Sequence, residues 1–191
     1  MTTFVLATAN PHKTVEMRAI LDGLGMAVVP RPTDVPDVEE TEDTLEGNAL
    51  LKARALVAAT GLAAVADDTG LFVDALDGAP GVYSARYAGE DATYDDNVTK
   101  LLAAMGDTVN RAARFRSVIC VAYPSGDTVL VEGVLEGTIT DERRGSEGFG
   151  YDPVFEPLEA NGRTLAELAP SEKNQLSHRA RALNALVVAL S

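Results

Sequence analysis

The sequence has few of the features that are typical of membrane proteins, of disulfide-linked proteins or of proteins that bind polyanions. Its 191 residues include one cysteine and no tryptophan, and no apolar run is long enough to cross a bilayer. The one cysteine, Cys120, lies in the apolar run 118–121, so we expect a buried hydrophobic side chain rather than a nucleophile. The first residues carry no basic signal segment. We therefore expect a cytoplasmic protein that does not bind a membrane.

Positive charge is also scarce. Lysine and arginine together number 16 against 29 aspartates and glutamates, which gives a formal net charge of -13. So acidic a chain repels nucleic acid, and we expect no nucleic-acid partner. A small phosphate ligand is compatible with this charge, because a few inward-facing lysines can build a local positive site. The two best-known phosphate loops, GxGxxG and GxxxxGK[ST], are absent from the sequence.

The pattern of apolar residues predicts an α/β protein in a single domain over residues 1–191. A β-α-β start followed by an antiparallel hairpin favours a central mixed β-sheet flanked by helices over a doubly wound Rossmann fold. The expected strands are 4–7, 27–29, 63–66, 71–73, 115–123 and 128–135. The expected helices are 11–23, 44–60, one beginning near 93, and 171–190.

The first candidate site is the turn Thr8-Ala9-Asn10-Pro11-His12-Lys13, between the end of a strand and the start of a helix. Backbone N–H groups and the helix dipole favour an anion there, and Lys13 adds a positive charge. The alternative is an ordinary capped turn with a solvated lysine.

Lys52 is the second candidate, because helical periodicity places it on the same face as three apolar residues, Leu45, Ala49 and Leu56. Either the side chain runs past the apolar stripe to water, or it is directed into a cleft and holds a phosphate. The sequence leaves both interpretations open.

The carboxylates Glu39, Glu40, Asp67 and Asp68 form the third candidate, because magnesium prefers oxygen ligands and shares its shell with substrate phosphates. Adjacent carboxylates after a buried strand repel each other unless a cation offsets them, which favours a functional interpretation of Asp67 and Asp68. For Glu39 and Glu40 alone, an acidic surface loop explains the pattern as well.

Two further segments carry aromatic and basic residues. In Gly148-Phe149-Gly150-Tyr151-Asp152-Pro153, two glycines permit close backbone approach and two aromatic rings offer faces for a base, although the segment also suits structural packing. In the segment 171–179, a helical wheel turns His178 away from the apolar stripe and puts Arg179 near its margin. Solvated positions at the start of a helix explain both residues equally well.

Together these segments resemble the inosine triphosphate pyrophosphatase family, over almost the whole chain. The matching motifs are Thr8–Lys13, Glu46–Ala53, Ala66–Leu71, Gly78–Tyr87, Gly148–Pro153 and Ser177–Arg179. The resemblance implies a homodimer with two lobes around a nucleotide cleft. It also implies hydrolysis of non-canonical purine nucleoside triphosphates (ITP, dITP, XTP) to the monophosphate and pyrophosphate.

The resemblance implies a role for each matching residue. Thr8, Ala9, Asn10, Pro11, His12 and Lys13 would cradle the phosphates, and Lys52 and Lys173 would neutralise them. Glu40 and Asp68 would hold Mg²⁺, with Asp68 also the base for water, and Glu39 is a possible substitute for Glu40. The base pocket maps to Phe149, Gly150, Tyr151, Asp152, His178 and Arg179. Thr69 stands where the family usually has serine, and it keeps the hydroxyl.

Two other functions compete with this one. A magnesium phosphatase with an aspartyl nucleophile would have one residue between its two acids, whereas Asp67 and Asp68 are adjacent. A non-catalytic purine nucleotide sensor would bind the same ligand without releasing pyrophosphate. The absence of a Ser, Cys or His nucleophile motif does not exclude an enzyme, because phosphoryl transfer needs mainly positioning and charge stabilisation.

Overall fold

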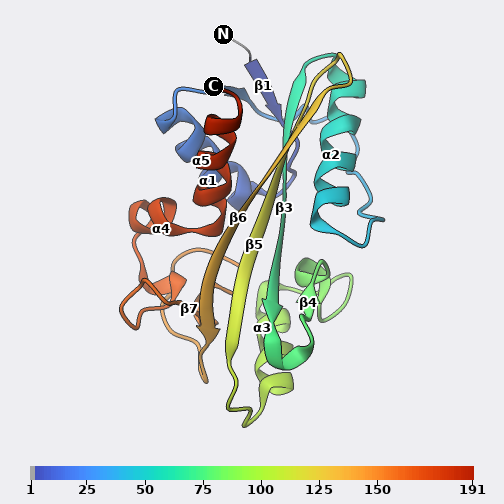
Figure 1. Ribbon diagram of the computed structural model, residues 1–191. Helices are drawn as coiled ribbons and strands as arrows, with labels where there is room; N and C mark the ends of the chain where they lie inside the picture. The colour runs from blue at the N-terminus through green and yellow to red at the C-terminus, as the bar shows by residue number, and fades with distance from the viewer. Residues whose placement is uncertain (1–2) are drawn as a thin grey trace. The chain divides into compact units, whose positions relative to one another are not determined.

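The computed structural model describes residues 3–191 (Figure 1). The chain divides into two compact units. Unit 1 contains the chain up to Asp68, together with Ser117–Gly133 and Arg179–Ser191. Unit 2 contains Thr69–Arg116 and Val134–His178. The chain therefore passes between the units inside three strands and once at the start of the last helix.

The elements alternate along the chain as the sequence predicts. The strands are β1 Thr3–Leu6, β2 Ala27–Val29, β3 Ala63–Val73, β4 Pro80–Gly81, β5 Ala112–Ala122, β6 Thr128–Ile139 and β7 Phe155–Pro157. The α-helices of the described residues are α1 Pro11–Gly23, α2 Leu45–Thr60, α3 Tyr94–Met105, α4 Pro170–Leu176 and α5 His178–Ala189. None of these helices is long and apolar enough to cross a membrane, in a search limited to residues 3–191.

The β-sheet is mixed, as expected. Its strand order is β2-β1-β3-β5-β6-β7, and β4 pairs with β3. Strand β1 runs parallel to both β2 and β3, with Phe4 opposite Ala63, whereas the pairs β3–β4 and β6–β7 are antiparallel. This combination confirms a mixed α/β fold rather than an all-parallel one.

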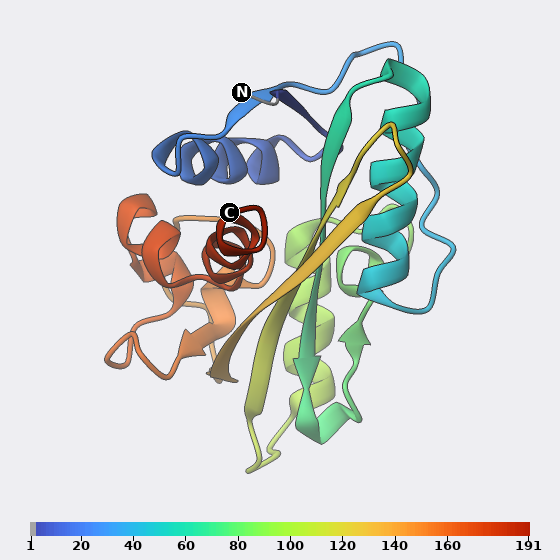
Figure 2. The same cartoon turned by 45° about the horizontal axis from the view of Figure 1, so that its top comes forward.

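In unit 1, helices α1 and α5 cover one face of the strands and α2 covers the other, which Figure 2 shows most clearly. The core on the α1 and α5 side contains Ala63 and Val65 of β3, packed with Met17, Leu21 and Leu183. Because side chains alternate between the two faces of a strand, position 67 points to the same side as 63 and 65. Position 68 then points toward α2.

In unit 2, the core contains residues of α3, of the strands and of the segment 151–168. The rings of Phe115 and Phe155 meet edge to face with their centroids 4.7 Å apart, and Leu101 and Met105 of α3 belong to the same cluster. Aromatic pairs of this geometry contribute stability beyond the area they bury. Tyr151 is part of this core.

Two of the predicted boundaries are wrong. The sequence suggests that a strand ends at the acidic pair, but β3 continues unbroken to Val73. Gly70 serves close strand approach instead of a turn, since a Cβ there would lie 2.5 Å from the carbonyl oxygen of Gly81 in β4. The predicted helix 171–190 is two helices, because the backbone of Ser177 is extended (φ -63°, ψ 158°) and ends α4. Serine is a residue type that favours helix boundaries.

Candidate functional site

Most of the charged candidate residues of unit 1 lie in one buried network. We call it the charge cluster; its members are Lys13, Glu16, Glu40, Lys52, Asp67, Asp68 and Arg179. Helices α1, α2 and α5, strand β3 and the segment before α2 each contribute at least one of these side chains.

The N-terminus of α1 fixes the position of Lys13. The side chain of Asn10 caps the helix by accepting hydrogen bonds from the backbone N–H groups of His12 (3.0 Å) and Lys13 (3.3 Å), and Pro11 occupies the first turn. Thr8 Oγ1 accepts from the N–H of Asn10 at 3.2 Å. In this structure the amides of His12 and Lys13 are engaged by the cap. The exposed side chains of this turn are Ala9, Pro11 and His12.

The ammonium group of Lys13 is not in bulk solvent. Its Nζ lies 2.6 Å from Oδ1 of Asp67, and the side chains are 17% and 0% exposed. The interpretation of Lys13 as an ordinary solvated lysine is therefore wrong. Any ligand of this ammonium has to share it with a buried carboxylate.

Lys52 lies deeper still. Its Nζ donates to Oε1 of Glu40 (2.9 Å), to Oδ1 of Asp68 (2.6 Å) and to the backbone carbonyl of Asp67 (2.9 Å). Burial lowers the pKa of Lys52, but Asp68 and Glu40 more than compensate and hold it above its usual value. Lys52 does not run past the apolar stripe to water, and that alternative is wrong.

The two carboxylates on Lys52 are electrostatically coupled. Burial raises the pKa of Asp68 to about 6, against the lowering effect of Lys52 and Lys13 and with a contribution from Glu40. Burial also acts to raise the pKa of Glu40, but Lys52 holds it below its usual value. One ammonium group therefore faces two acids. The neighbouring Glu39 is exposed, so the structure brings Glu40 rather than Glu39 to Lys52.

Asp67 has different partners from Asp68, because the two side chains leave β3 on opposite faces. Burial would raise the pKa of Asp67, but Arg179 and Lys13 hold it far below its usual value. Nε of Arg179 lies 3.1 Å from Oδ2 of Asp67, and Nη1 of Arg179 is paired with Glu16. Cations supplied by the protein, rather than an external ion, thus offset the charge of Asp67.

In unit 2, Asp152 organises the glycine and aromatic segment. Its Oδ2 accepts hydrogen bonds from the backbone N–H of Phe149 at 2.8 Å and from Nζ of Lys173 at 2.6 Å. The Asp152 and Lys173 side chains are 3% and 5% exposed. Gly148 has φ +74°, and a Cβ there would lie 2.0 Å from Oδ2 of Asp152. Glycine is therefore required where the loop closes on this carboxylate.

The two aromatic rings of this segment differ in accessibility. The Phe149 ring is half-buried, with Nζ of Lys173 4.8 Å from its centroid and the Tyr94 ring 5.8 Å away. A pocket of about 210 Å³ lies beside Phe149 and Tyr94. Tyr151 is buried and its hydroxyl donates to the carbonyl of Ser84 at 2.9 Å. The expectation that both rings offer a face to a base is therefore wrong for Tyr151.

His178 and Arg179 are both buried, 3% and 1% exposed, so neither is a solvated residue at the start of a helix. The imidazole of His178 stacks on the Phe115 ring with centroids 4.5 Å apart and an interplanar angle of 18°. His178 belongs to unit 2 and Arg179 to unit 1. Thr69 likewise follows Asp68 directly in β3 and belongs to unit 2.

The sequence interpretation missed Glu16 and Ser117 as members of this environment. Glu16 lies three residues after Lys13 on α1, which places both on one face of the helix. Ser117 Oγ lies 3.3 Å from Oδ2 of Asp67, across 50 residues of sequence. The helical spacing is a signal that the sequence offers for Glu16, whereas nothing in the sequence links Ser117 to Asp67.

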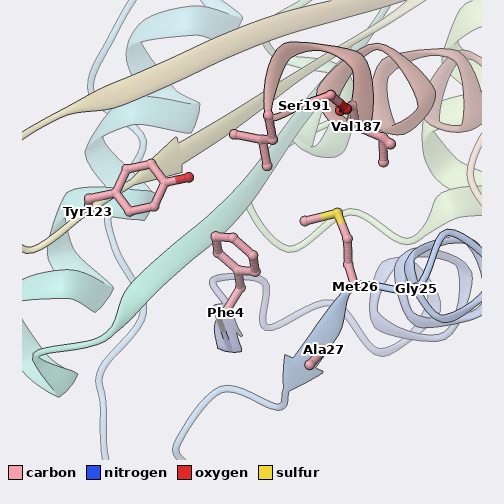
Figure 3. Close-up of a pocket in the computed structure, with 8 residues that line it drawn as sticks. Phe4, Gly25, Met26, Ala27, Tyr123, Val187 and Ser191 are labelled. Atoms are coloured by element: carbon pink, nitrogen blue, oxygen red, sulfur yellow. The ribbon is translucent and has the colours of Figure 1, made fainter. Parts of the chain in front are cut away.

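Unit 1 also contains an apolar pocket of about 300 Å³ (Figure 3). Phe4, Met26, Tyr123 and Val187 direct their side chains into it. The complete lining is Phe4, Gly25, Met26, Ala27, Tyr123, Val187, Leu190 and Ser191. These residue types provide no charged side chain, so this pocket is unsuited to a polyphosphate.

The chain closely matches known proteins in sequence. The sequence profile of the Ham1 family matches residues 4–189. The dITP/XTP pyrophosphatase of Symbiobacterium thermophilum is 52% identical over 182 residues, which cover 94% of this chain and 90% of that protein. The dITP/XTP pyrophosphatase of Streptomyces coelicolor is 47% identical over 196 residues, covering 98% and 96%.

Solved structures agree with the sequence matches. A HAM1 protein from Coxiella burnetii superposes with a TM-score of 0.89 at 44% identity, covering 100% of this chain and 98% of that one. A structure from Mycobacterium abscessus, described as a nucleoside-triphosphatase / dITP/XTP pyrophosphatase, has a TM-score of 0.77 at 44% identity and covers 100% of both chains. These similarities confirm the α/β fold class.

Proposed function

The chain belongs to the Ham1 family, and from that membership we propose that it hydrolyses non-canonical purine nucleoside triphosphates (ITP, dITP, XTP) to the monophosphate and pyrophosphate. The observation that carries the proposal is the position of Lys52, whose ammonium group is buried between Glu40 and Asp68. A structural lysine on an apolar helix face would reach water, whereas this one is held in a charged site. Such an arrangement suits a ligand that brings both negative charge and a metal ion.

We assign phosphate binding to the segment Thr8–Lys13 and to Lys52, and Lys173 is the further lysine available to neutralise the phosphates. Lys13 and Lys52 are fixed by carboxylates, so they act as preorganised positive charges for the polyphosphate and for the departing pyrophosphate. Thr69 would add a hydroxyl donor.

Glu40 and Asp68 are the residues that would hold Mg²⁺. Their two carboxylates face one ammonium group, and burial, with a contribution from Glu40, raises the pKa of Asp68 despite the nearby lysines. Within residues 3–191, no three His, Cys, Asp or Glu side chains form a ready-made metal cage. Magnesium commonly binds one or two carboxylates and completes its shell with substrate oxygens and water, so this donor set fits the ion. Bound there, Mg²⁺ would offset phosphate charge.

Asp68 is our candidate for the base. Its carboxylate would take a proton from the water that attacks the α-phosphoryl group, and the bond to the pyrophosphate oxygen would break. Burial shifts its pKa upward to about 6, closer to neutral pH, where a carboxylate is a more effective base. No covalent intermediate is needed in this scheme.

For the base of the nucleotide we propose the segment Phe149, Gly150, Tyr151 and Asp152, with His178 and Arg179 as hydrogen-bond donors. The half-buried ring of Phe149 supplies a stacking face, while Tyr151 would contribute main-chain groups only, because its ring is in the core. Sequence resemblance supports the roles of His178 and Arg179.

Product analysis tests the proposal. Incubation of the chain with ITP and MgCl₂ should release inosine monophosphate and pyrophosphate in equal amounts, and chelation of the metal should stop the reaction. Inosine diphosphate with orthophosphate would instead identify a phosphatase acting on the γ-phosphoryl group. Tight ITP binding without any product would identify a nucleotide sensor.

We also propose that the protein is a homodimer in the cytoplasm. Sequence resemblance supports the homodimer, and the single, buried cysteine suits a reducing compartment. Sedimentation velocity across a range of protein concentrations measures the oligomeric state directly.

A further inference from the structure

Asp67 is not among the residues assigned a role in the reaction above, yet its side chain and backbone together contact every cation of the charge cluster. Its Oδ1 lies 2.6 Å from Nζ of Lys13, and its Oδ2 lies 3.1 Å from Nε of Arg179. Its backbone carbonyl accepts a hydrogen bond from Nζ of Lys52 at 2.9 Å. The side chain of Asp67 itself is 0% exposed, so it cannot meet a solvent-borne ligand without a rearrangement.

Around the Asp67 side chain, positive and negative side chains are equal in number. On its face of β3, the two cations Lys13 and Arg179 are matched by the two acids Asp67 and Glu16. On the opposite face, Lys52 is outnumbered by Glu40 and Asp68. The two neighbouring aspartates therefore have different ionic partners. Asp68 shares Lys52 with Glu40, whereas Asp67 is paired with Lys13 and Arg179.

We propose that Asp67 is a positioning residue, which holds the ammonium group of Lys13 in place for the phosphates of the substrate. This inference rests on the proposed function, since it takes Lys13 to be a phosphate ligand. A lysine ammonium carries three N–H donors, so one bond to Asp67 leaves two for a phosphate. A free lysine side chain loses rotamer entropy when it binds a phosphate, whereas a side chain that is already held loses less.

The geometry separates this role from that of a general acid or base. Asp67 is enclosed by α1, β5 and α5 through Lys13, Ser117 and Arg179, and its carboxylate is directed away from Asp68 and Glu40. It acts on the substrate through Lys13. The competing explanation is purely structural: Asp67 would only neutralise the buried Arg179.

A double-mutant cycle distinguishes the two explanations. The variants are Asp67→Asn, Lys13→Met and the combination, each assayed for kcat and KM with ITP at saturating Mg²⁺ and for thermal stability. We expect Asp67→Asn to raise KM roughly tenfold, the scale of one charge-assisted hydrogen bond, with a smaller effect on kcat. In the Lys13→Met background the same substitution should leave KM within about twofold, because the lysine it positions is gone. Multiplicative effects on KM in the double variant would overturn the inference.

Ser117→Ala is the matched control. It removes a neutral contact to the same carboxylate while both cationic partners stay, and KM should remain within about twofold of the wild-type value. A KM increase as large as that of Asp67→Asn would show that any disturbance of this pocket has the same effect, and would overturn the assignment to Lys13.

Loss of folding in Asp67→Asn would leave a test on the wild-type chain. The sequence has only four lysines, Lys13, Lys52, Lys100 and Lys173, so their side-chain ¹⁵N signals can be assigned by single substitutions. Without nucleotide, the Nζ protons of Lys13 should exchange with water at least tenfold more slowly than those of a lysine in a short unstructured peptide. Equal exchange would show that Lys13 is not held and would overturn the inference. Wild-type enzyme that releases no pyrophosphate from ITP would refute the proposed function instead, and the exchange result would still stand.

Discussion

Nζ of Lys52 in α2 lies 2.6 Å from Oδ1 of Asp68 in β3. Neither residue type is common in a protein interior unless it is paired. Glu40 contacts the same ammonium group, so removal of Lys52 would leave two largely buried carboxylates facing each other. The predictions about this group follow from that arrangement.

Lys52→Met should lower kcat/KM for ITP by about 30-fold, equivalent to roughly 2 kcal/mol of transition-state stabilisation. It should also lower the melting temperature, because Glu40 and Asp68 then face each other without a cation. Addition of MgCl₂ should restore part of that loss, which differential scanning calorimetry with and without the metal would measure. Unchanged kinetics would return Lys52 to a structural role.

Asp68→Asn should abolish turnover while the fold stays intact, because it removes a metal ligand and a base together. Pyrophosphate release and circular dichroism on the same preparation test this. Near-normal activity at saturating Mg²⁺ would exclude both roles.

Glu40→Gln should weaken activation by Mg²⁺, whereas Glu39→Gln should not. The two glutamates are adjacent, but Glu40 contacts Lys52 and Glu39 is exposed, so the pair is a matched comparison. The measurement is the Mg²⁺ concentration for half-maximal rate in each variant. A larger shift in the Glu39 variant would reverse the assignment.

Phe149→Ala should reduce kcat/KM for ITP and ATP by similar factors, since stacking on an aromatic face tolerates any base.

Arg179→Ala should reduce the ratio of kcat/KM for ITP to kcat/KM for ATP, because a 6-oxo group accepts a hydrogen bond that adenine's amino group does not. This variant should also lose roughly 3 kcal/mol of stability or more, as Asp67 and Glu16 lose their buried partner. The ratio must therefore be measured below the variant's melting temperature. A constant ratio would place base recognition in the main chain of Gly148–Asp152.

Cys120 should resist thiol reagents in the folded protein. Burial raises the pKa of its thiol to about 11, so at pH 8 only about one molecule in a thousand carries a thiolate, even before access is considered. Labelling with a thiol-specific dye in native buffer should be at least a hundredfold slower than in denaturant. Equal rates would show that β5 opens frequently in the native state.

The sequence was sufficient wherever a signal is local. The Asn10 cap followed by Pro11 marks the start of α1 at the correct residue, and the apolar run around Cys120 correctly predicts burial. Lys52 was visible as an anomaly, because its neighbours on one helical face are apolar. Its partners lie 12 to 16 residues away, beyond the reach of a periodicity argument.

Signals that depend on distant contacts were misread. Asp67-Asp68-Thr69-Gly70 has the composition of a turn, but the surrounding strands and the cations on each face keep it extended. A helical wheel describes Arg179 only in relation to its own helix, while its partner Asp67 is 112 residues earlier. The pairing that buries Arg179 exists only after the chain has folded, so the sequence did not reveal it.

The discontinuity of unit 1 has a consequence for synthesis. This unit draws on the beginning, middle and end of the chain, and its charge network is incomplete until Arg179 has been added. On the ribosome, where the chain emerges from its N-terminus, Asp67 and Glu16 are made more than a hundred residues before the guanidinium that neutralises them. Unit 2 is complete at His178, one residue earlier. The nascent chain must therefore keep two acids solvated until residue 179 has been added, so unit 1 is completed after unit 2.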